Sequence, residues 1–287
     1  MIVDAHHHFW DPAAADYPWL TGALAPIHRA FGPGDFAPLL RSAGVDATVL
    51  VQTRSSLSET EDFLAIARDS RFIRGVVGWV DLTNASVDET IARLRAGPGG
   101  ERLVAIRHQV HDEPDAGWLD RPDVRRGIKA VGSAGLVYDL LVRAREVPAA
   151  RRLAIDLPDV RFVVDHLAKP AIRDGADPAW DVAVGALAGV PNVWWKLSGL
   201  VTEADWHTWR PADLQPFVDH ILSIAGPSRL LFGSDWPVCL LAAEYETVLA
   251  TAQTLIASLT PDERAAVLGG TALSVYGLGP VPSRDDT

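Results

Sequence analysis

Two histidines, His6 and His8, stand two residues apart at the end of the first apolar run, residues 2–8. Alternate residues of a strand share one face, so both imidazoles are predicted to point into the same space while His7 points to the opposite side. Two imidazoles on one strand face form half of a site for a divalent metal ion. The run continues into an aromatic pair, which indicates that the triplet belongs to the fold and is not an appended histidine tag.

Two later apolar runs end at residues that also bind metals or move protons. One closes on His166, and the other is followed directly by Asp235. Active sites of parallel-barrel enzymes gather at the C-terminal ends of the strands, which favours a functional His166 over a structural one. Asp235 is predicted to ligate a metal or to accept a proton, with a plain helix N-cap as the alternative.

Charged side chains stand near the ends of three further runs. Arg107 is followed by His108. Because an arginine is costly to bury alone, Arg107 is predicted either to pair with a carboxylate or to face an anionic or carbonyl-bearing ligand. Lys196 is predicted to act on a ligand or to form an ion pair at the rim of the site, and Asp139 carries the same two alternatives.

Ten tryptophans are many for a chain of 287 residues. Five of them fall in or beside the loops that are predicted to ring the mouth of the site: Trp10, Trp19, Trp206, Trp209 and Trp236. Flat indole faces suit sugar rings and also suit hydrophobic packing between loops. As a group they favour a pocket for a ring-shaped substrate.

The elements that must position these residues alternate along the chain. Short apolar runs rich in Val, Ile, Leu and aromatic residues have the length of buried strands. There are eight of them: residues 2–8, 47–52, 75–80, 103–108, 135–141, 161–166, 193–197 and 230–234.

The segments between these runs carry helix signals. Serine–glutamate pairs and residues that precede a proline mark helix starts, and glycines mark helix ends. The signals are the capping boxes of Ser58 with Glu61 and of Ser86 with Glu89, the N-caps Asp177 and Thr260, and the end glycines Gly97 and Gly226.

Strands separated by helices must pair in parallel, because a parallel connection needs a long crossover. Eight strand–helix repeats predict an α/β fold, a single-domain (β/α)8 TIM barrel over residues 1–278, followed by a polar tail, residues 279–287. Two insertions interrupt the pattern, residues 9–35 and 202–211. A doubly wound sheet is the structural rival, but it usually carries a glycine-rich phosphate loop after the first strand, where this chain has histidines.

Composition excludes several classes of protein. Hydrophobic residues make up 48% and charged residues 22%, as in a cored globular protein, and the net charge of −11 argues against nucleic acid or an anionic membrane as partner. The single cysteine, Cys239, permits no intrachain disulfide and predicts a reducing compartment. The N-terminus lacks a secretion signal and no run of eighteen apolar residues occurs, so a cytoplasmic location is expected. The sequence gives no indication of the oligomeric state.

The constellation of His-x-His, a later histidine and a late aspartate resembles the amidohydrolase superfamily. More narrowly, the chain is similar to the "amidohydrolase 2" branch, which contains sugar-lactone hydrolases of the L-fuconolactonase and L-rhamnonolactonase type. The longer matches, around Lys196 and Asp235, are specific, whereas a bare His-x-His is not. The matching segments run in order through residues 4–11, 17–20, 49–52, 106–108, 165–170, 196–200 and 232–239.

This resemblance implies a metal site and its ligands. One divalent ion is expected, Zn²⁺ with Mn²⁺ or Fe²⁺ as alternatives, held by His6, His8, His166 and Asp235. Binuclear members of the superfamily use a carboxylated lysine, and no lysine closes the fourth or fifth predicted strand here, so at most one metal ion is expected. Some members of the branch resemble metal-free hydrolases, which leaves a metal-independent reaction open.

The resemblance also implies a reaction, the hydrolysis of a sugar-acid lactone to the free aldonic acid in carbohydrate catabolism. Asp235 would take a proton from the attacking water and return it to the leaving ring oxygen. The predicted helpers are His166, Arg107 and His108 at the reacting carbonyl, and Trp10, Trp19, Lys196 and Trp236 against the substrate.

Three other functions remain open on the same barrel. One is metal-dependent decarboxylation of an aromatic acid, and another is binding of a sugar acid without turnover. The third is hydrolysis of a dicarboxylate lactone of the muconolactone or pyrone type. That reaction needs a second arginine at the mouth, which Arg54 or Arg210 would supply.

Overall fold

The structure, a computed structural model, describes residues 1–279. In this part of the chain a sheet of eight parallel strands follows the chain order, each strand pairing with the next. The sheet closes where β8 meets β1, through hydrogen bonds from Asp235 N to His6 O (2.8 Å) and from His8 N to Trp236 O (2.7 Å). The strands are β1 (Val3–His7), β2 (Ala47–Val51), β3 (Ile73–Gly78), β4 (Leu103–His108), β5 (Val137–Leu140), β6 (Phe162–Val164), β7 (Val193–Leu197) and β8 (Leu230–Phe232).

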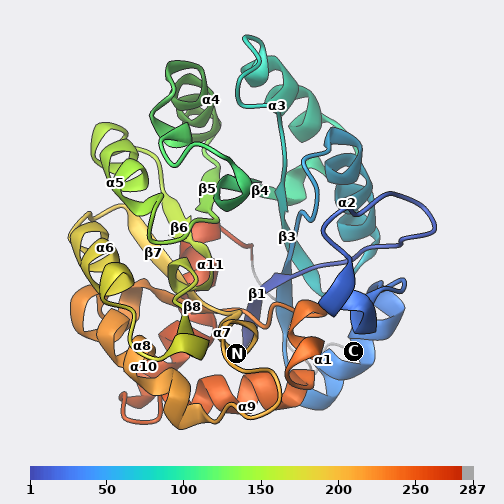
Figure 1. The fold of residues 1–287 in the computed structure, drawn as a ribbon. Helices are drawn as coiled ribbons and strands as arrows, with labels where there is room; N and C mark the ends of the chain where they lie inside the picture. The colour runs from blue at the N-terminus through green and yellow to red at the C-terminus, as the bar shows by residue number, and fades with distance from the viewer. Residues whose placement is uncertain (280–287) are drawn as a thin grey trace.

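Helices surround the strands, as the view into the barrel shows (Figure 1). The predicted (β/α)8 barrel is therefore confirmed, and the doubly wound sheet is excluded by the closed strand order. The helices are α1 (Pro33–Ala43), α2 (Leu57–Asp69), α3 (Val87–Ala96), α4 (Pro122–Ser133), α5 (Val147–Asp156), α6 (Pro178–Ala188), α7 (Leu200–Glu203), α8 (Pro211–Ala225), α9 (Tyr245–Leu255), α10 (Pro261–Ala265) and α11 (Thr271–Tyr276).

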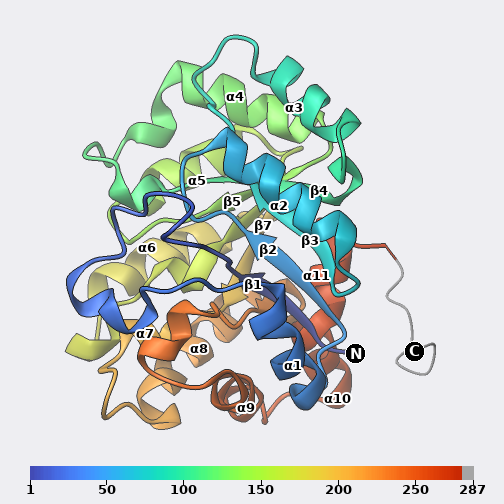
Figure 2. The ribbon, with the colours of Figure 1, turned by 90° about the vertical axis from the view of Figure 1, so that its right-hand side faces the viewer.

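The inside of the barrel has an apolar core of its own at the end where the strands begin. Small and β-branched side chains from the strands fill it, and α11 closes it from below with Val275 and Tyr276. Figure 2 shows α11 at the same end of the barrel as the N-terminus. The functional site is therefore expected at the opposite end of the barrel, where the strands finish. The strand residues of this inner core are Val3, Ala5, Ala47, Val49, Val51, Val77, Val104, Ala105, Val137, Val163 and Leu231.

Strand β1 departs from strict alternation. Val3 and Ala5 both belong to the inner core, and continued alternation would also turn His7 inward. The pairing of β1 with β2 is irregular between Asp4 and His7, and the side chains change face there. His7 therefore packs outward against α1, while the two flanking histidines face the interior as predicted.

Most of the helix signals are borne out, but one is misplaced by two residues and another marks a helix start without forming its capping box. Helix α2 begins two residues before the predicted start, with Ser56 as N-cap accepting from Glu59 N, because Ser56 and Glu59 have the same spacing as Ser58 and Glu61. Helix α3 does start after Ser86, but that side chain makes no cap hydrogen bond. The remaining signals are confirmed, with N-caps at Asp177 and Thr260 and helix ends at Gly97 and Gly226.

The first insertion and the C-terminal tail depart from the repeated pattern of strand and helix. The first insertion holds the 3-10 helix η1 (Gly22–Ile27), which packs beside a second, η8 (Val238–Leu241). Of the predicted polar tail, only Gly279 lies in the described part, and residues 280–287 fall outside it. Among residues 1–279, no helix combines the length and apolar character that a membrane crossing requires.

Candidate functional site

A layer of charged side chains lies inside the barrel, above the apolar core. Lys196 Nζ contacts Asp139 Oδ2 at 2.5 Å and Asp165 Oδ1 at 2.9 Å, and all three residues are fully buried. Arg107 donates from Nη1 to Asp165 Oδ2 at 2.8 Å and from Nη2 to Gln52 Oε1 at 3.0 Å. Strands β4, β5 and β7 and the residue that follows β6 thus each supply one charge to this layer, and the carboxylate partner predicted for Arg107 is confirmed.

The two buried carboxylates differ because they share the cations unequally. Burial raises the pKa of Asp139 to about 6, although Lys196 and the hydroxyl of Tyr276 both act against this shift. Burial also acts to raise the pKa of Asp165, but Lys196, His6 and Arg107 outweigh it and hold that pKa well below its usual range. Asp165 therefore stays ionised at acidic pH, whereas Asp139 takes up a proton near pH 6.

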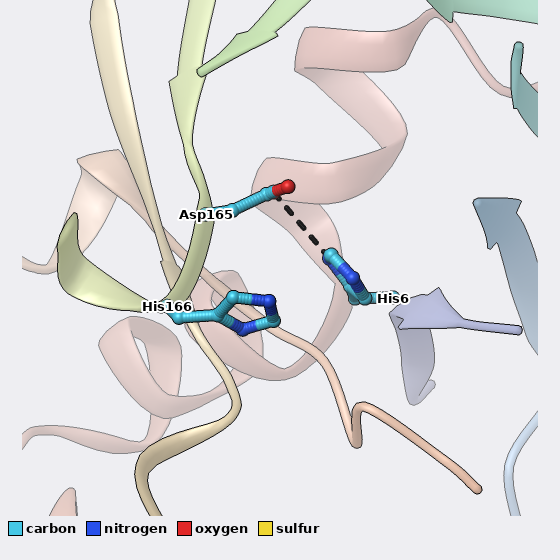
Figure 3. A group of neighbouring side chains, drawn as sticks. All are labelled: His6, Asp165 and His166. Atoms are coloured by element: carbon cyan, nitrogen blue, oxygen red, sulfur yellow. Dashed lines mark ion pairs between the residues drawn. The ribbon is translucent and has the colours of Figure 1, made fainter. Parts of the chain in front are cut away.

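Above this layer, three of the predicted metal ligands converge on one point. His8 Nε2 lies 3.2 Å from Asp235 Oδ1 and 3.1 Å from His6 Nε2, and His6 Nε2 lies 3.7 Å from the same carboxylate oxygen. His166 Nε2 faces that oxygen at 4.0 Å. The Asp165 carboxylate points toward the His6 ring, and the His166 ring lies beside the same imidazole (Figure 3). Asp165 Oδ1 lies 3.4 Å from His6 Nδ1.

The closure of the barrel positions Asp235. Its backbone has a left-handed φ of 60°, and the segment is tied to β1 on both sides of the residue. Asp4, fully buried in β1, accepts a hydrogen bond from Ser234 N at 2.8 Å. The cost of the left-handed backbone is offset by these bonds, which fix the carboxylate against the histidines of β1.

His166 sits in a left-handed turn after β6. Residues 166–169 all have φ between 51° and 62°, which costs about 1–2 kcal/mol per residue for side chains other than glycine. Trp180 of α6 donates from Nε1 to Leu167 O at 2.6 Å and holds the turn. Ser198 Oγ lies 2.9 Å from His166 Nδ1 and orients the ring, so that Nε2 faces Asp235.

We expect Gly199→Ala to displace His166. A Cβ at Gly199 would stand 2.4 Å from His166 Nδ1, and the backbone φ of +66° adds strain of about 1–2 kcal/mol. The expected result is a loss of about 10²-fold in kcat/KM for the hydrolysis that the sequence predicts, because a shift near 1 Å in a site residue has that effect. The matched control is Gly277→Ala, where φ is +62° and no atom lies within 4 Å of the added Cβ. Equal activity in the two variants would contradict this role for Gly199.

The protonation states suit metal binding. Burial lowers the pKa of His6 well below its usual value and that of His166 to about 4, so both imidazoles are neutral at pH 7. Burial alone would raise the pKa of Asp235, but the facing imidazoles of His166, His8 and His6 outweigh it, and the carboxylate is ionised. Neutral imidazoles and a carboxylate are the donors that Zn²⁺ takes in proteins.

The tautomer of His8 supports the same reading. Its Nδ1 lies 2.8 Å from Val51 O, which can only accept, so Nδ1 donates this hydrogen bond and Nε2 is the ring atom directed at Asp235 Oδ1, 3.2 Å away. Two lone pairs at this distance repel each other, so a proton or a cation must lie between the two atoms. Ligands of a tetrahedral Zn²⁺ stand about 3.3 Å apart, close to the separations among His6, His8 and Asp235. The donor set therefore fits one divalent ion.

A cavity of about 260 Å³ opens onto this cluster. Its walls differ in character, with apolar side chains from the first insertion and η8 and polar or cationic ones from the loops after β4, β5 and β6. The lining residues are His8, Trp19, Leu24, Thr53, Arg107, Gln109, His111, Asp112, Leu141, Arg143, His166, Lys169, Asp235 and Val238.

Several residues predicted for the site do not reach the cavity. His108 follows Arg107 on a strand, so it points to the outer face, where it stacks on Trp118 and bonds Glu113 at 2.7 Å. Lys196 lies in the charged layer below, with no exposed surface. The resemblance implied that both residues act at the substrate. Position at the end of a strand does not by itself show on which face of the strand a side chain lies.

Of the three tryptophans predicted to contact substrate, the cavity is lined by Trp19 alone among the described residues. Trp10 is buried behind it, with the two ring centroids 5.2 Å apart and its Nε1 donating to Ile27 O. Trp236 stacks on Phe36 of α1 at 4.4 Å. For these two, hydrophobic packing is the better account.

Sequence reasoning missed much of the polar wall. Gln109, His111, Arg143 and Lys169 follow strands by one to five residues, and the strand-end rule that found His166 extends to them. None forms a recognisable motif alone, and only the closed barrel brings them together.

His111 gives a stability prediction with a defined pH range. Burial, reinforced by the charges of Lys169, Arg143 and Arg107, lowers its pKa to about 3. The unfolded chain binds this proton near pH 6.5 and the native state does not, so the stabilisation is present above pH 6.5 and is lost as the pH falls toward 3. Between pH 7 and pH 5 we expect wild type to lose about 2 kcal/mol of unfolding free energy that His111→Gln retains.

Urea denaturation at both pH values measures this difference. His28→Gln, at an exposed position, serves as the control and should follow wild type. Parallel pH profiles for wild type and His111→Gln would rule the explanation out.

Comparison with known proteins identifies the family. The sequence matches the amidohydrolase family over residues 3–278. It is 41% identical over 281 residues to the L-fucono-1,5-lactonase of Burkholderia ambifaria (96% of this chain, 94% of that protein) and 39% identical over 289 residues to that of Burkholderia multivorans (97% and 96%). A solved amidohydrolase from Burkholderia multivorans with bound Zn, 39% identical, has a TM-score of 0.91 and covers 97% of this chain and 99% of its own. The chain belongs to the amidohydrolase family, as its strand-end histidines and aspartate predicted.

Proposed function

We propose that this chain hydrolyses the ring ester of a sugar-acid lactone, with L-fucono-1,5-lactone as the closest substrate type. The observation that carries the proposal is the cluster of Asp235 with His6 and His8, which opens onto the cavity. The predicted reaction class agrees with two L-fucono-1,5-lactonases that are 39% and 41% identical over nearly the whole chain. The enzyme is accordingly a hydrolase acting on a carboxylic ester.

We assign the metal site to His6, His8, His166 and Asp235, with Zn²⁺ as the first choice of ion. Zn bound to the amidohydrolase of Burkholderia multivorans supports this choice. When bound, such an ion supplies a water molecule whose pKa is lowered toward neutrality. Asp165, which contacts His6 Nδ1 at 3.4 Å, then acts as the outer partner that orients this imidazole.

The side chains of the protein account for the proton transfers. Asp235 accepts a proton from water as the oxygen attacks the lactone carbonyl, and it returns that proton to the ring oxygen as the C–O bond breaks. Arg107, buried and lining the cavity, donates to the charge that develops on the carbonyl oxygen. Trp19 packs against the sugar ring from the opposite, apolar wall.

A hydrolysis screen tests the proposal. Sugar 1,4- and 1,5-lactones, a dicarboxylate lactone and a carboxylated aromatic acid are each offered to enzyme before and after chelation, and proton release is followed with a pH indicator. We expect opening of the sugar lactones, with activity lost on chelation and recovered with Zn²⁺. Turnover of the aromatic acid or of the dicarboxylate lactone instead would replace the proposed reaction by one of those two. Unchanged activity in enzyme shown to be free of metal would overturn the metal assignment.

The location in the cell remains as the sequence predicts it, in a reducing compartment such as the cytoplasm. The burial of Cys239, the only cysteine of the chain, is compatible with this proposal.

A further inference from the structure

We propose that Arg143 forms a subsite for the carboxylate of the ring-opened acid, so that the enzyme binds its product as an anion. The inference rests on the proposed function. Lactone hydrolysis breaks the bond between the carbonyl carbon and the ring oxygen and forms one to the oxygen of water. The ring oxygen keeps one proton of the water, and the new acid releases the other, so a neutral ligand becomes an anion within the cavity.

Arg143 lines the cavity as an exposed residue, and among residues 1–279 it differs from the other cations of the cavity in having no counter-ion. Arg107 is paired with Asp165 at 2.8 Å, and Lys169 is paired with Glu203. Within residues 1–279, no carboxylate and no hydrogen-bond acceptor contacts the guanidinium of Arg143. An unpaired guanidinium in a ligand cavity favours a ligand group that carries negative charge.

The backbone that carries this side chain is held in place. Arg143 N donates to Glu146 Oε2 at 2.9 Å, and Glu146 N donates back to Arg143 O at 3.0 Å. Glu146 has no exposed surface, so this capped turn after β5 is anchored in the protein. The adjacent loop after β4 is bound to it by a hydrogen bond from His111 N to Leu141 O at 3.1 Å. The guanidinium is therefore presented from a fixed base, while its own donors remain available to a ligand.

The surrounding wall reinforces the preference for an anion. Arg107 stands on β4 and Lys169 follows β6, the two strands that flank β5, and His111, close enough to feel both charges, is neutral at pH 7. The carboxylates that line the cavity are Asp235, which faces the histidine cluster, and Asp112, whose side chain is 64% exposed and lies 3.3 Å from His111 Nε2. The product carboxylate can thus leave Asp235 for the cationic wall after the ester bond breaks.

The two arginines that the sequence analysis considered for such a role lie elsewhere. Arg54 contacts Glu59 at 3.3 Å and lines a separate hollow beside α2. Arg210 is exposed and stands 3.8 Å from Asp213 at the start of α8. Arg143 therefore supplies the second arginine of the mouth.

Calorimetric binding to folded, metal-loaded enzyme tests the subsite without turnover. The probes are sodium L-fuconate and L-fucitol, which share their hydroxyl groups and differ by carboxylate against CH₂OH. We expect wild type to bind L-fuconate at least about tenfold more tightly than L-fucitol, as one charge-assisted contact warrants. Arg143→Gln should remove that difference and leave L-fucitol binding unchanged, Arg143→Lys should keep part of it, and Arg210→Gln should behave as wild type.

Three results would overturn the subsite. One is equal affinity of wild type for the two probes, and another is full L-fuconate affinity in Arg143→Gln. The third is faster turnover of a lactone that bears its own carboxylate, lost in Arg143→Gln, which would assign Arg143 to a substrate carboxylate. If Arg143→Gln does not fold, the affinities of Arg143→Lys decide. Opening of L-fucono-1,5-lactone by wild type is measured separately. If the binding results contradict the Arg143 subsite but the lactone is opened, the proposed function stands. If the lactone is not opened, the proposed function itself is contradicted.

Discussion

Asp235→Asn is expected to lower kcat/KM for lactone hydrolysis by about 10³-fold, within the range that general acid–base groups contribute. Asparagine keeps the shape of the side chain and its bonds along the β1–β8 closure, but an amide neither accepts the proton of water nor returns one to the ring oxygen. Initial rates with a pH indicator measure the loss. Because Asp235 lies 3.2 Å from His8 Nε2, metal content must be determined in the same preparation.

Two controls separate the proton role from loss of metal or of fold. Asp213→Asn, at an exposed carboxylate on α8, should retain wild-type rates. Asp235→Asn loaded with Zn²⁺ to wild-type stoichiometry should remain inactive. A metal-replete variant that keeps a tenth or more of the wild-type rate would show that another group moves the proton.

Lys196→Met is expected to lower the free energy of unfolding by about 3–5 kcal/mol, the usual cost of removing one partner from a buried ion pair. The substitution leaves Asp139 and Asp165 fully buried with only Arg107 to neutralise them. Methionine fills much of the lysine stem, so the loss reflects charge more than volume. Urea denaturation at pH 7 provides the measurement.

The double variant Lys196→Met with Asp139→Asn isolates the electrostatic part. Removing one carboxylate along with the lysine should recover a large share of the lost stability, because one uncompensated charge then disappears from the interior. The deficit of the single variant should also shrink toward pH 5, since a carboxylate that lacks its cation binds a proton more tightly in the native state. A single variant as stable as wild type, or a double variant worse than the sum of its parts, would refute this account of the charged layer.

The sequence predicts the features that depend on local patterns, and it does not predict those that depend on long-range packing. All eight strands lie where their apolar runs predict, since a buried parallel strand carries its signal in its own residues. The convergence of His6, His8 and Asp235 follows from the same rule, because parallel strands of a barrel end at one rim.

The incorrect predictions concern residues whose role depends on which face of a strand they occupy or on contacts with residues far away in the sequence. His108 was grouped with Arg107, yet adjacent strand residues point to opposite sides, which excludes His108 from the cavity. Trp236 follows the strand-end rule but stacks on Phe36 from a helix some two hundred residues earlier, a contact that no local pattern encodes. Lys196 was expected at the rim of the site. The structure shows it in the charged layer between the apolar core and the cavity, where it is the buried counter-ion of Asp139 and Asp165.

In this cavity, water is expected to open a sugar lactone by attack at the carbonyl carbon. The most direct test is the opening of L-fucono-1,5-lactone by folded, metal-replete wild type in H₂¹⁸O, with the rate compared to buffer and the product analysed by mass spectrometry. We expect a rate well above that in buffer and one ¹⁸O atom in the carboxylate of the product. Opening no faster than in buffer, or a product without the label, would contradict it.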